Sequence, residues 1–278
     1  MISSTSLSSF MLSQRGLRDA TVIIQKAAER LATGSKINRA SDNPAGMIAV
    51  SKLDLRIKEL DKKITLLGME EARLGAKDGA LSVVSGMLEE LNGIVVSAAN
   101  TAGLSQEEKQ ALQTQADSIL QGMDFIANTT VFKGEKLFDS LFSTSLGKVD
   151  YKKEGKEGKE ETASTTLAGL GSGGGLNLID GDLEAAQKSV KSALNSILGS
   201  QGAIGNRIKN GIEPMRQVYL SEIEASQSVR SDIADTDIAA EMSNLVRGQI
   251  LQQASIFGLL SAQNNSKQSL ALLQNALG

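Results

Sequence analysis

The sequence predicts a mainly α protein: a long antiparallel helical hairpin or coiled-coil bundle of its N- and C-terminal halves, with one short β-hairpin and a small flexible central insertion. Three observations support this prediction. Aromatic residues make up 3% of the 278 residues and only two residues are proline, a composition that suits long packed helices. Apolar residues recur every three or four positions over long stretches of both halves. Between the halves, residues 148–161 are rich in charge and almost devoid of apolar side chains.

Residue types on which many enzymes and metal proteins depend are missing. The chain has no cysteine and no histidine. This excludes disulfides, thiolate metal sites and cysteine nucleophiles, and it removes the commonest general base. The net charge of −3 gives no sign of a nucleic-acid partner. We therefore predict no catalytic residues, no metal ligands and no cofactor. The chain starts without a secretory signal, and the many Gln, Asn and Ser residues of 248–266 argue against membrane insertion.

The first 33 residues are expected to form an amphipathic helix. Its apolar positions are spaced by three and four residues and are Leu17, Ala20, Ile24, Ala27 and Leu31. Gly34 suits the end of this helix, where a left-handed residue is common. Residues 34–46 contain two glycines, a proline and several Asn, Asp and Ser residues, so we predict a loop there.

A second, unusually long helix is expected from about Met47 to Asn100. Its apolar seam steps by four and three residues through Leu53, Ile57, Leu60, Ile64 and Leu67. A seam of this kind requires a partner helix, as in a coiled coil. Glu71 and Asp78 interrupt it. At 1.5 Å per residue the helix would be about 80 Å long.

Capping and turn signals mark the next two elements. After a turn at 101–105, Ser105 and Glu108 form a capping box at the start of a helix that ends near Ala127. Residues 128–138 then predict a short β-hairpin with its turn at Lys133 and Gly134.

The centre of the chain predicts a flexible surface insertion over residues 143–181, because it is first highly charged and then rich in Gly and Ser. The glycines of 171–175 lack the Lys-Ser/Thr of a phosphate-binding loop, so they predict a flexible turn. Helical spacing resumes after Asp182, a good N-cap. Pro214 is expected to kink or break that helix.

The last helix, expected from about Ile238 to Leu277, is apolar around most of its surface. Its large apolar residues cannot all face one neighbour, and a lone helix of this kind would be only marginally stable in water. Three acidic residues precede it, namely Asp232, Asp235 and Asp237. They lack the glycine and the bidentate glutamate of a calcium loop, so helix capping is the expected role.

Three blocks of the sequence resemble bacterial flagellins. Residues 29–46 read ERLATGSKINRASDNPAG, which is similar to the family pattern E-R-L-[ST]-[ST]-G-x-[RK]-I-N-x-A-x-D-[DN]-[AP]-A-G. Residues 128–139 (NTTVFKGEKLFD) resemble the family's hairpin, and residues 230–265 resemble its C-terminal block. The blocks occur in the family's order. The chain departs from the family at its end, where Lys267 replaces the usual proline.

The resemblance implies a structural subunit, not an enzyme, that self-assembles into the helical filament of the bacterial flagellum, the propeller for swimming. It also implies terminal helices that form an inner tube by folding as they assemble. The implied domains are the N-terminal half of the inner tube with its linker (1–46), the N-terminal half of the outer tube with hairpin 128–138 (47–142), a variable surface insertion (143–181), the C-terminal half of the outer tube (182–231), and the linker with the C-terminal half of the inner tube (232–278).

Partners and location also follow from the resemblance. It implies secretion by the flagellar type III apparatus into the extracellular filament. The expected partners are further copies of the chain, hook-associated junction and cap proteins, and an export chaperone on the C-terminal helix. The linker motif would comprise Gly34, Ile37, Asn38, Asp42, Asn43, Pro44 and Gly46. Polymerisation would involve Leu17, Ile24, Ala27, Leu31, Met242, Leu245, Val246, Ile250, Leu251, Phe257 and Leu260.

One further stretch departs from the family. Many flagellins are Arg-rich where this chain has Glu89, Glu90, Leu91, Asn92, Gly93, Ile94, Val95 and Val96, and the Toll-like receptor that detects flagellin binds there. Acidic residues facing an acidic receptor patch repel it. We therefore expect weak binding to this receptor.

Three other functions compete with the filament subunit. A hook–filament junction protein of the same superfamily builds few copies, but the block QILQQ at 249–253 favours a flagellin. A secreted coiled-coil translocator would need a long apolar hairpin, which is missing. An enzyme would need a catalytic constellation, and none is present.

Overall fold

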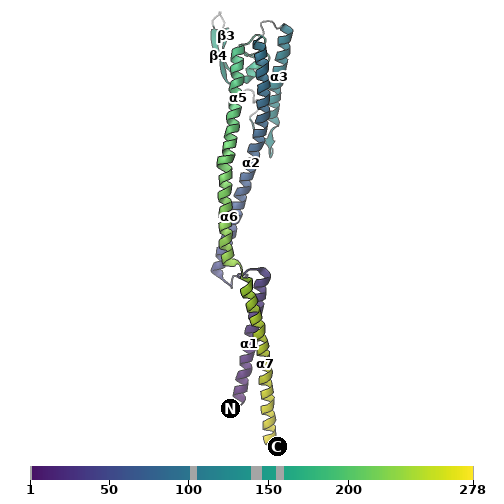
Figure 1. Ribbon diagram of the computed structural model, residues 1–278, viewed down its shortest axis with the longest axis vertical. Coiled ribbons are helices and arrows are strands. Elements are labelled where there is room, and N and C mark those ends of the chain that lie inside the picture. Colours follow the sequence, from purple (N-terminus) through teal and green to yellow (C-terminus); the bar gives the residue numbers. More distant parts are fainter. Residues whose placement is uncertain (1, 101–104, 139–145, 155–159, 278) are drawn as a thin grey trace. The chain divides into compact units, whose positions relative to one another are not determined.

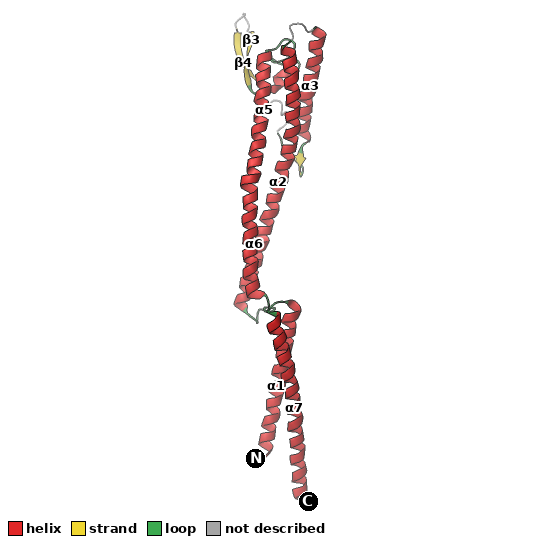
Figure 2. Cartoon of the chain, viewed as in Figure 1, coloured by secondary structure: helices red, strands yellow, loops and turns green. Residues whose placement is uncertain are grey.

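The computed structural model describes residues 2–100, 105–138, 146–154 and 160–277. They form two compact units. The terminal unit comprises Met1–Asp61 with Leu220–Gly278, and the central unit comprises Lys62–Tyr219. Long helices dominate both units (Figures 1 and 2), so the mainly α prediction is confirmed. The helices are α1 (Ile2–Thr33), α2 (Pro44–Ala99), α3 (Gln106–Thr129), α5 (Leu183–Asn206), α6 (Glu213–Ala234) and α7 (Ile238–Leu277).

The strands form two separate antiparallel hairpins rather than the single one expected. The first hairpin pairs β1 (Val131–Phe132) with β2 (Glu135–Lys136), and Lys133 and Gly134 take up positive φ angles at its turn. This confirms the predicted hairpin. The second pairs β3 (Val149–Glu154) with β4 (Glu160–Thr165) inside the segment expected to be flexible.

The core of the central unit forms where α2, α3 and α5 meet. Its fully buried residues include Leu81, Leu88 and Leu91 of α2, Met123 of α3 and Ile197 of α5. Burying each such side chain contributes about 1.5–3 kcal/mol relative to leaving it in water. Within the predicted seam of α2, Leu53, Ile57 and Ile64 are half-buried. Leu60 in the terminal unit and Leu67 in the central unit are also buried.

Ion pairs join α2 to α6, which runs antiparallel to it. In the terminal unit Arg56 Nη2 lies 2.6 Å from Glu222 Oε1, and Arg230 Nε lies 2.7 Å from Asp54 Oδ1. In the central unit Arg216 pairs with Glu71. Glu71 thus interrupts the apolar seam because it faces an arginine there. These pairs are partly exposed, so each contributes at most about 1 kcal/mol.

Two predicted helix caps are confirmed. The Ser105 hydroxyl accepts the Glu108 N–H, and the Glu108 carboxylate accepts the Ser105 N–H, which completes the capping box. The Asp182 carboxylate accepts the Ala185 N–H at 3.0 Å and starts α5. The predicted turn before Ser105 lies outside the described residues.

The prediction of a flexible insertion over 143–181 is wrong for its second half. Leu167 and Leu170, in the short 3-10 helix η1 (Leu167–Leu170), are fully buried, as are Leu176 and Leu178. The buried Gln113 side chain of α3 holds this loop, because its Nε2 donates to the Leu170 carbonyl and its Oε1 accepts the Leu178 N–H, each at 2.7 Å. The four leucines of residues 167–178 are therefore part of the core. The tip of the insertion lies outside the described residues.

Pro214 does not break its helix. A π-helical turn, η2 (Arg207–Ile212), precedes it, and helical structure is continuous from Leu183 to Ala234. The Glu213 N–H donates to the Ile208 carbonyl five residues earlier. A proline in a regular α-helix clashes with the carbonyl four residues before it. The wider turn relieves this clash, so the chain departs from regular helix before the proline rather than at it.

Candidate self-association surface

The terminal helices α1 and α7 lie side by side and antiparallel (Figure 1). They meet through small residues. A Cβ placed on Gly248 would lie 2.7 Å from Ile24 Cγ1, and one on Gly16 would lie 2.8 Å from Ser255 Oγ. Three alanines are buried nearby, namely Ala20, Ala27 and Ala262. Only glycine permits an approach this close, so a narrow seam holds the pair together.

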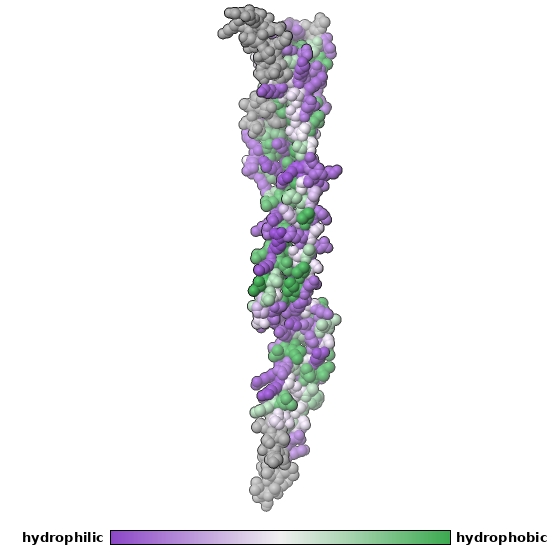
Figure 3. Space-filling view, turned by 90° about the vertical axis from the view of Figure 1, so that its left-hand side faces the viewer, coloured by the Kyte–Doolittle hydropathy of each residue, from purple (hydrophilic) through white to green (hydrophobic). Residues whose placement is uncertain are grey.

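The large apolar side chains of α7 remain exposed because the seam is narrow. Phe257 is 71% and Ile250 61% exposed. In the part of α7 whose side chains the structure describes, the other exposed large apolar residues are Ile238, Met242, Val246, Leu251, Ile256 and Leu260. Figure 3 shows hydrophobic residues on the open surface of the terminal helices. An apolar surface of this extent marks an interaction site.

The predicted polymerisation residues therefore divide into two groups. Ala27 is buried in the seam, and four others are half-buried beside it: Leu17, Ile24, Leu31 and Leu245. The rest are exposed, namely Met242, Val246, Ile250, Leu251, Phe257 and Leu260. The first group lies at or beside the seam, whereas the second group is available to other molecules.

The linker motif joins the two chain segments between α1 and α2 and between α6 and α7. Gly34 ends α1 with a φ of +68°, and its carbonyl accepts the Thr236 N–H at 3.0 Å. The Lys36 N–H donates to the Ala234 carbonyl at 2.7 Å, and the Ser35 hydroxyl donates to the same carbonyl at 3.0 Å. The two linker segments are thus hydrogen-bonded to each other where α1 ends and α7 begins.

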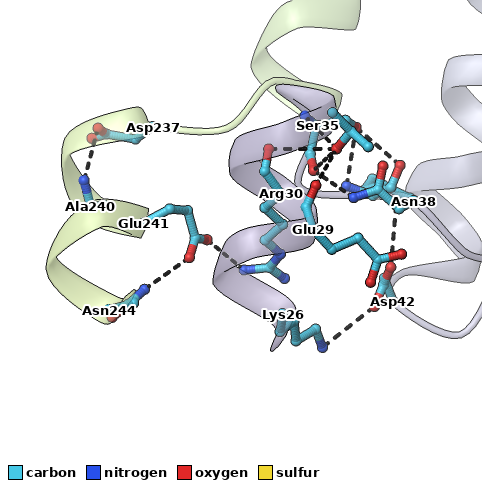
Figure 4. Close-up of polar contacts among 12 residues, drawn as sticks. Lys26, Glu29, Arg30, Ser35, Asn38, Asp42, Asp237, Ala240, Glu241 and Asn244 are labelled. Atoms are coloured by element: carbon cyan, nitrogen blue, oxygen red, sulfur yellow. Dashed lines mark hydrogen bonds and ion pairs between the residues drawn. The ribbon is translucent and has the colours of Figure 1, made fainter. Parts of the chain in front are cut away.

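Asp42 organises the loop that leads into α2 (Figure 4). Its Oδ2 accepts the N–H groups of Arg39 and Asn38 at 3.0 and 3.2 Å, and Lys26 Nζ lies 3.4 Å from its Oδ1. The hydrogen bond from Arg39, then that from Asn38 and the pairing with Lys26, lower the pKa of this carboxyl. The loop therefore depends on an ionised Asp42.

Helix α2 begins at Pro44, three residues before the predicted start. The Asn43 side-chain oxygen accepts the Gly46 N–H at 2.9 Å, as in an N-cap, and Pro44 occupies the first helical position. A Cβ on Gly46 would lie 2.7 Å from Ile37 Cδ1 and 2.6 Å from Asn43 Nδ2. Asn43, Pro44 and Gly46, with Ile37 packed against them, thus each have a role in starting this helix.

A partly buried ion pair that the sequence did not predict joins α1 to α7. Arg30 Nη1 lies 2.7 Å from Glu241 Oε1, and Glu241 Oε2 accepts from Asn244 at 3.2 Å (Figure 4). The hydrogen bond from Arg30 outweighs burial and lowers the pKa of Glu241. Arg30 lies in the flagellin-like block 29–46 and Glu241 in the block 230–265. The family resemblance was therefore the one signal in the sequence that could have pointed to this pair.

A polar cavity of about 420 Å³ opens beside this pair. Four carboxylates and two cations line it: Asp42, Asp235, Asp237 and Glu241, with Arg30 and Lys36. Asp237 caps α7, because its Oδ1 accepts the N–H groups of Ala239 and Ala240. Among the described residues, no group of three or more His, Cys, Asp or Glu side chains could hold a metal ion.

The stretch aligned with the receptor motif lies on α2 with only part of it accessible. Leu91, Ile94 and Val95 are buried in the core, whereas Glu89, Glu90 and Gly93 are exposed. Asn92 and Val96 are half-buried. The accessible charge of this stretch is therefore acidic.

Helix α2 is also the one helix in the described chain that is long and apolar enough to cross a membrane by length and composition. One third of its most apolar window (33%) is buried inside the fold.

Comparisons with known proteins agree with this arrangement. Residues 4–143 match the bacterial flagellin N-terminal helical region, and residues 183–273 match the bacterial flagellin C-terminal helical region. A flagellin of Listeria innocua serovar 6a is 27% identical, over 95% of this chain and 96% of its own length. The flagellin of Bacillus subtilis strain 168 is 25% identical over 90% and 92%. The flagellar filament 33 kDa core protein of Treponema phagedenis is 24% identical over 96% and 98%. The match spans both helical halves, and the chain belongs to the bacterial flagellin family.

Proposed function

We propose that this chain is a structural subunit that self-assembles into the helical filament of the bacterial flagellum, and that α1 and α7 drive its assembly. The observation that carries the proposal is the exposed apolar surface of α7, from Met242 to Leu260. The narrow seam with α1 leaves this surface uncovered. Additional copies of the chain would cover it.

The driving force for assembly is the burial of these side chains. At about 25 cal/mol per Å², covering one half-exposed Leu, Ile or Phe contributes roughly 1 kcal/mol. Several such side chains per copy, added over the neighbours in a filament, offset the loss of freedom on association. In this proposal α1 and α7 form the inner tube, and the central unit contributes to the outer tube.

Electron microscopy of the purified chain after salting out tests the proposal. We expect long filaments of uniform width from the full chain. Deletion of residues 240–278, or of residues 1–33, leaves a folded central unit that forms none. The matched control replaces residues 150–164 with Gly-Gly. Its ends, Val149 and Thr165, are paired in the hairpin, so the join does not strain the core.

Filaments from the 240–278 deletion would refute the role of α7. Monomers or short caps from the full chain would instead favour a hook–filament junction protein. The control deletion must assemble like the full chain, since the residues that it removes lie outside the terminal helices.

The proposed partners follow from the same role. Cap and junction proteins would meet the filament ends. An export chaperone would cover the apolar surface of α7 before type III secretion to the extracellular filament. Exposed Glu89 and Glu90 favour weak binding to the innate receptor for flagellin. Strong activation of receptor-expressing reporter cells, lost on replacing residues 89–96, would contradict this last point.

A further inference from the structure

The outward face of α1 holds two arginines among apolar side chains. Helical spacing places Met11, Arg15, Arg18 and Val22 on one face, opposite the buried Ala20. Met11 is 52% and Val22 59% exposed, and both arginines are exposed. Within the described part of the chain, Arg15 and Arg18 make no hydrogen bond or ion pair. This face is therefore both apolar and positively charged.

Covering this face in a filament takes both guanidinium groups out of water. That step rests on the proposed function, in which other copies pack around the terminal helices. An arginine buried without an anionic partner is strongly unfavourable. The neighbouring copy must therefore present carboxylates at these two positions.

The terminal helices contain almost no carboxylates that could do so. Beyond Glu241, α7 and the end of the chain contain no Asp or Glu. Before Glu29, α1 contains only Asp19, which neighbours Arg18 itself. The partner carboxylates must come from another part of the neighbouring copy.

The linker offers them. Asp232, Asp235 and Asp237 are exposed, lie within six residues, and make no ion pair in the described chain. Asp235 and Asp237 line the 420 Å³ cavity, where four carboxylates face two cations. The Asp235 Oδ2 accepts from Ser231 at 2.6 Å, which leaves its other oxygen for a donor from outside.

We propose that the linker cavity of one copy receives Arg15 and Arg18 from α1 of a neighbouring copy. The geometry sets the shift between the two copies. Asp235 pairs with Ser35 of the same chain, and Ser35 lies 17 residues beyond Arg18, or about 25 Å along a helix of 1.5 Å rise. For copies that run parallel, this contact sets a shift of about 25 Å along α1.

Single-cysteine variants test this contact directly, because the chain has no cysteine of its own. Filaments are grown from a mixture of Arg18→Cys and Asp235→Cys chains and then treated with a short bismaleimide, whose linker spans the gap left by the arginine side chain, because a disulfide would need Cα atoms within about 7 Å of each other. We expect covalent dimers on a denaturing gel from the mixture only, and a ladder of longer oligomers when one chain carries both changes. A bridge within one chain is excluded, since about 25 Å far exceeds the span of a short bismaleimide.

Charge reversal provides the second test. Arg18→Glu should raise the critical concentration for assembly at least tenfold, and the swap Arg18→Glu with Asp235→Arg should restore most of the loss. Lys191→Glu, an exposed change on α5, is the matched control and should assemble normally. Failure of the unchanged chain to polymerise would refute the proposed function. Normal filaments from Arg18→Glu, with no cross-link from the mixture, would refute only this contact.

Discussion

The central core and the terminal helix pair use apolar residues in opposite ways. In the central unit, Leu88 and Leu91 are fully buried because α2, α3, α5 and the loop at 167–178 surround them. In the terminal unit, α1 and α7 have only each other at most positions and meet through Gly16, Gly248 and the buried alanines. The number of neighbouring elements, rather than the apolar content of a helix, therefore decides whether the helix can bury its apolar side chains within one chain.

The largest expected effect comes from truncating the core. Leu88→Ala, at a side chain with 0% exposure, should lower the free energy of unfolding by about 2–5 kcal/mol. Phe257→Ala, at an exposed position of α7, should change it by less than about 0.5 kcal/mol and should raise the critical concentration for assembly. Urea unfolding of the monomer and sedimentation of filaments measure the two quantities. Equal effects of both changes on unfolding would abolish the distinction between the regions.

The buried glutamine of α3 gives the next largest effect. Gln113→Ala leaves the Leu170 carbonyl and the Leu178 N–H without partners inside the core. Each unsatisfied group costs about 1–3 kcal/mol. We expect a loss of about 2–3 kcal/mol in urea unfolding and faster hydrogen exchange at the Leu178 amide. Unchanged exchange at that amide would mean that the glutamine does not hold the loop.

Matched glycine substitutions compare the seam with open helix surface. Gly248→Ala places a methyl group against Ile24 and should weaken the α1–α7 pair by about 1–2 kcal/mol, seen as a higher critical concentration. Gly199→Ala on α5 meets nothing within 4 Å and should stabilise the central unit by about 0.5–1 kcal/mol. If Gly248→Ala left the critical concentration unchanged, the close approach of α1 to α7 at this glycine would not be needed for assembly.

The smallest effect concerns pH. The pKa of Glu241 is lowered in the folded chain by Arg30. Its contribution to stability is therefore fully present at pH values above the ordinary pKa of glutamate, and it is lost as the pH falls through the lowered pKa. The pKa of Asp42 is also lowered, so protonation of this carboxyl should add to the loss of stability. Filament dissociation followed by light scattering should therefore increase below about pH 4. In Glu241→Gln the dependence should be shallower, and an identical profile would exclude this pair as a cause.

Local signals in the sequence predicted most of the fold. Helical spacing located the long helices, and short-range chemistry located the caps at Ser105 and Asp182 and the turn at Lys133 and Gly134. These features depend on residues within one or two turns of each other. The linker motif was found by family resemblance, and the structure supplies a local role for each of its residues.

Most of the features that sequence reasoning missed depend on distant residues, and one depends on a local turn without a sequence signal. Leu167 and Leu178 lie in a Gly-rich segment without periodicity, and the side chain that holds the segment, Gln113, is more than 50 residues earlier. The Arg30–Glu241 pair joins residues 211 positions apart. The accommodation of Pro214 depends on a π-turn that no residue pattern announced.

Hydrogen–deuterium exchange on monomer and filament measures directly whether other copies complete the terminal helices. We expect slow exchange of the core of α2, α3 and α5 in both states. In α1 and α7 we expect rapid exchange in the monomer and strong protection in the filament, because only other copies cover their exposed apolar side chains. Equal protection of α1 and α7 in monomer and filament would mean that these helices are already stable within one chain.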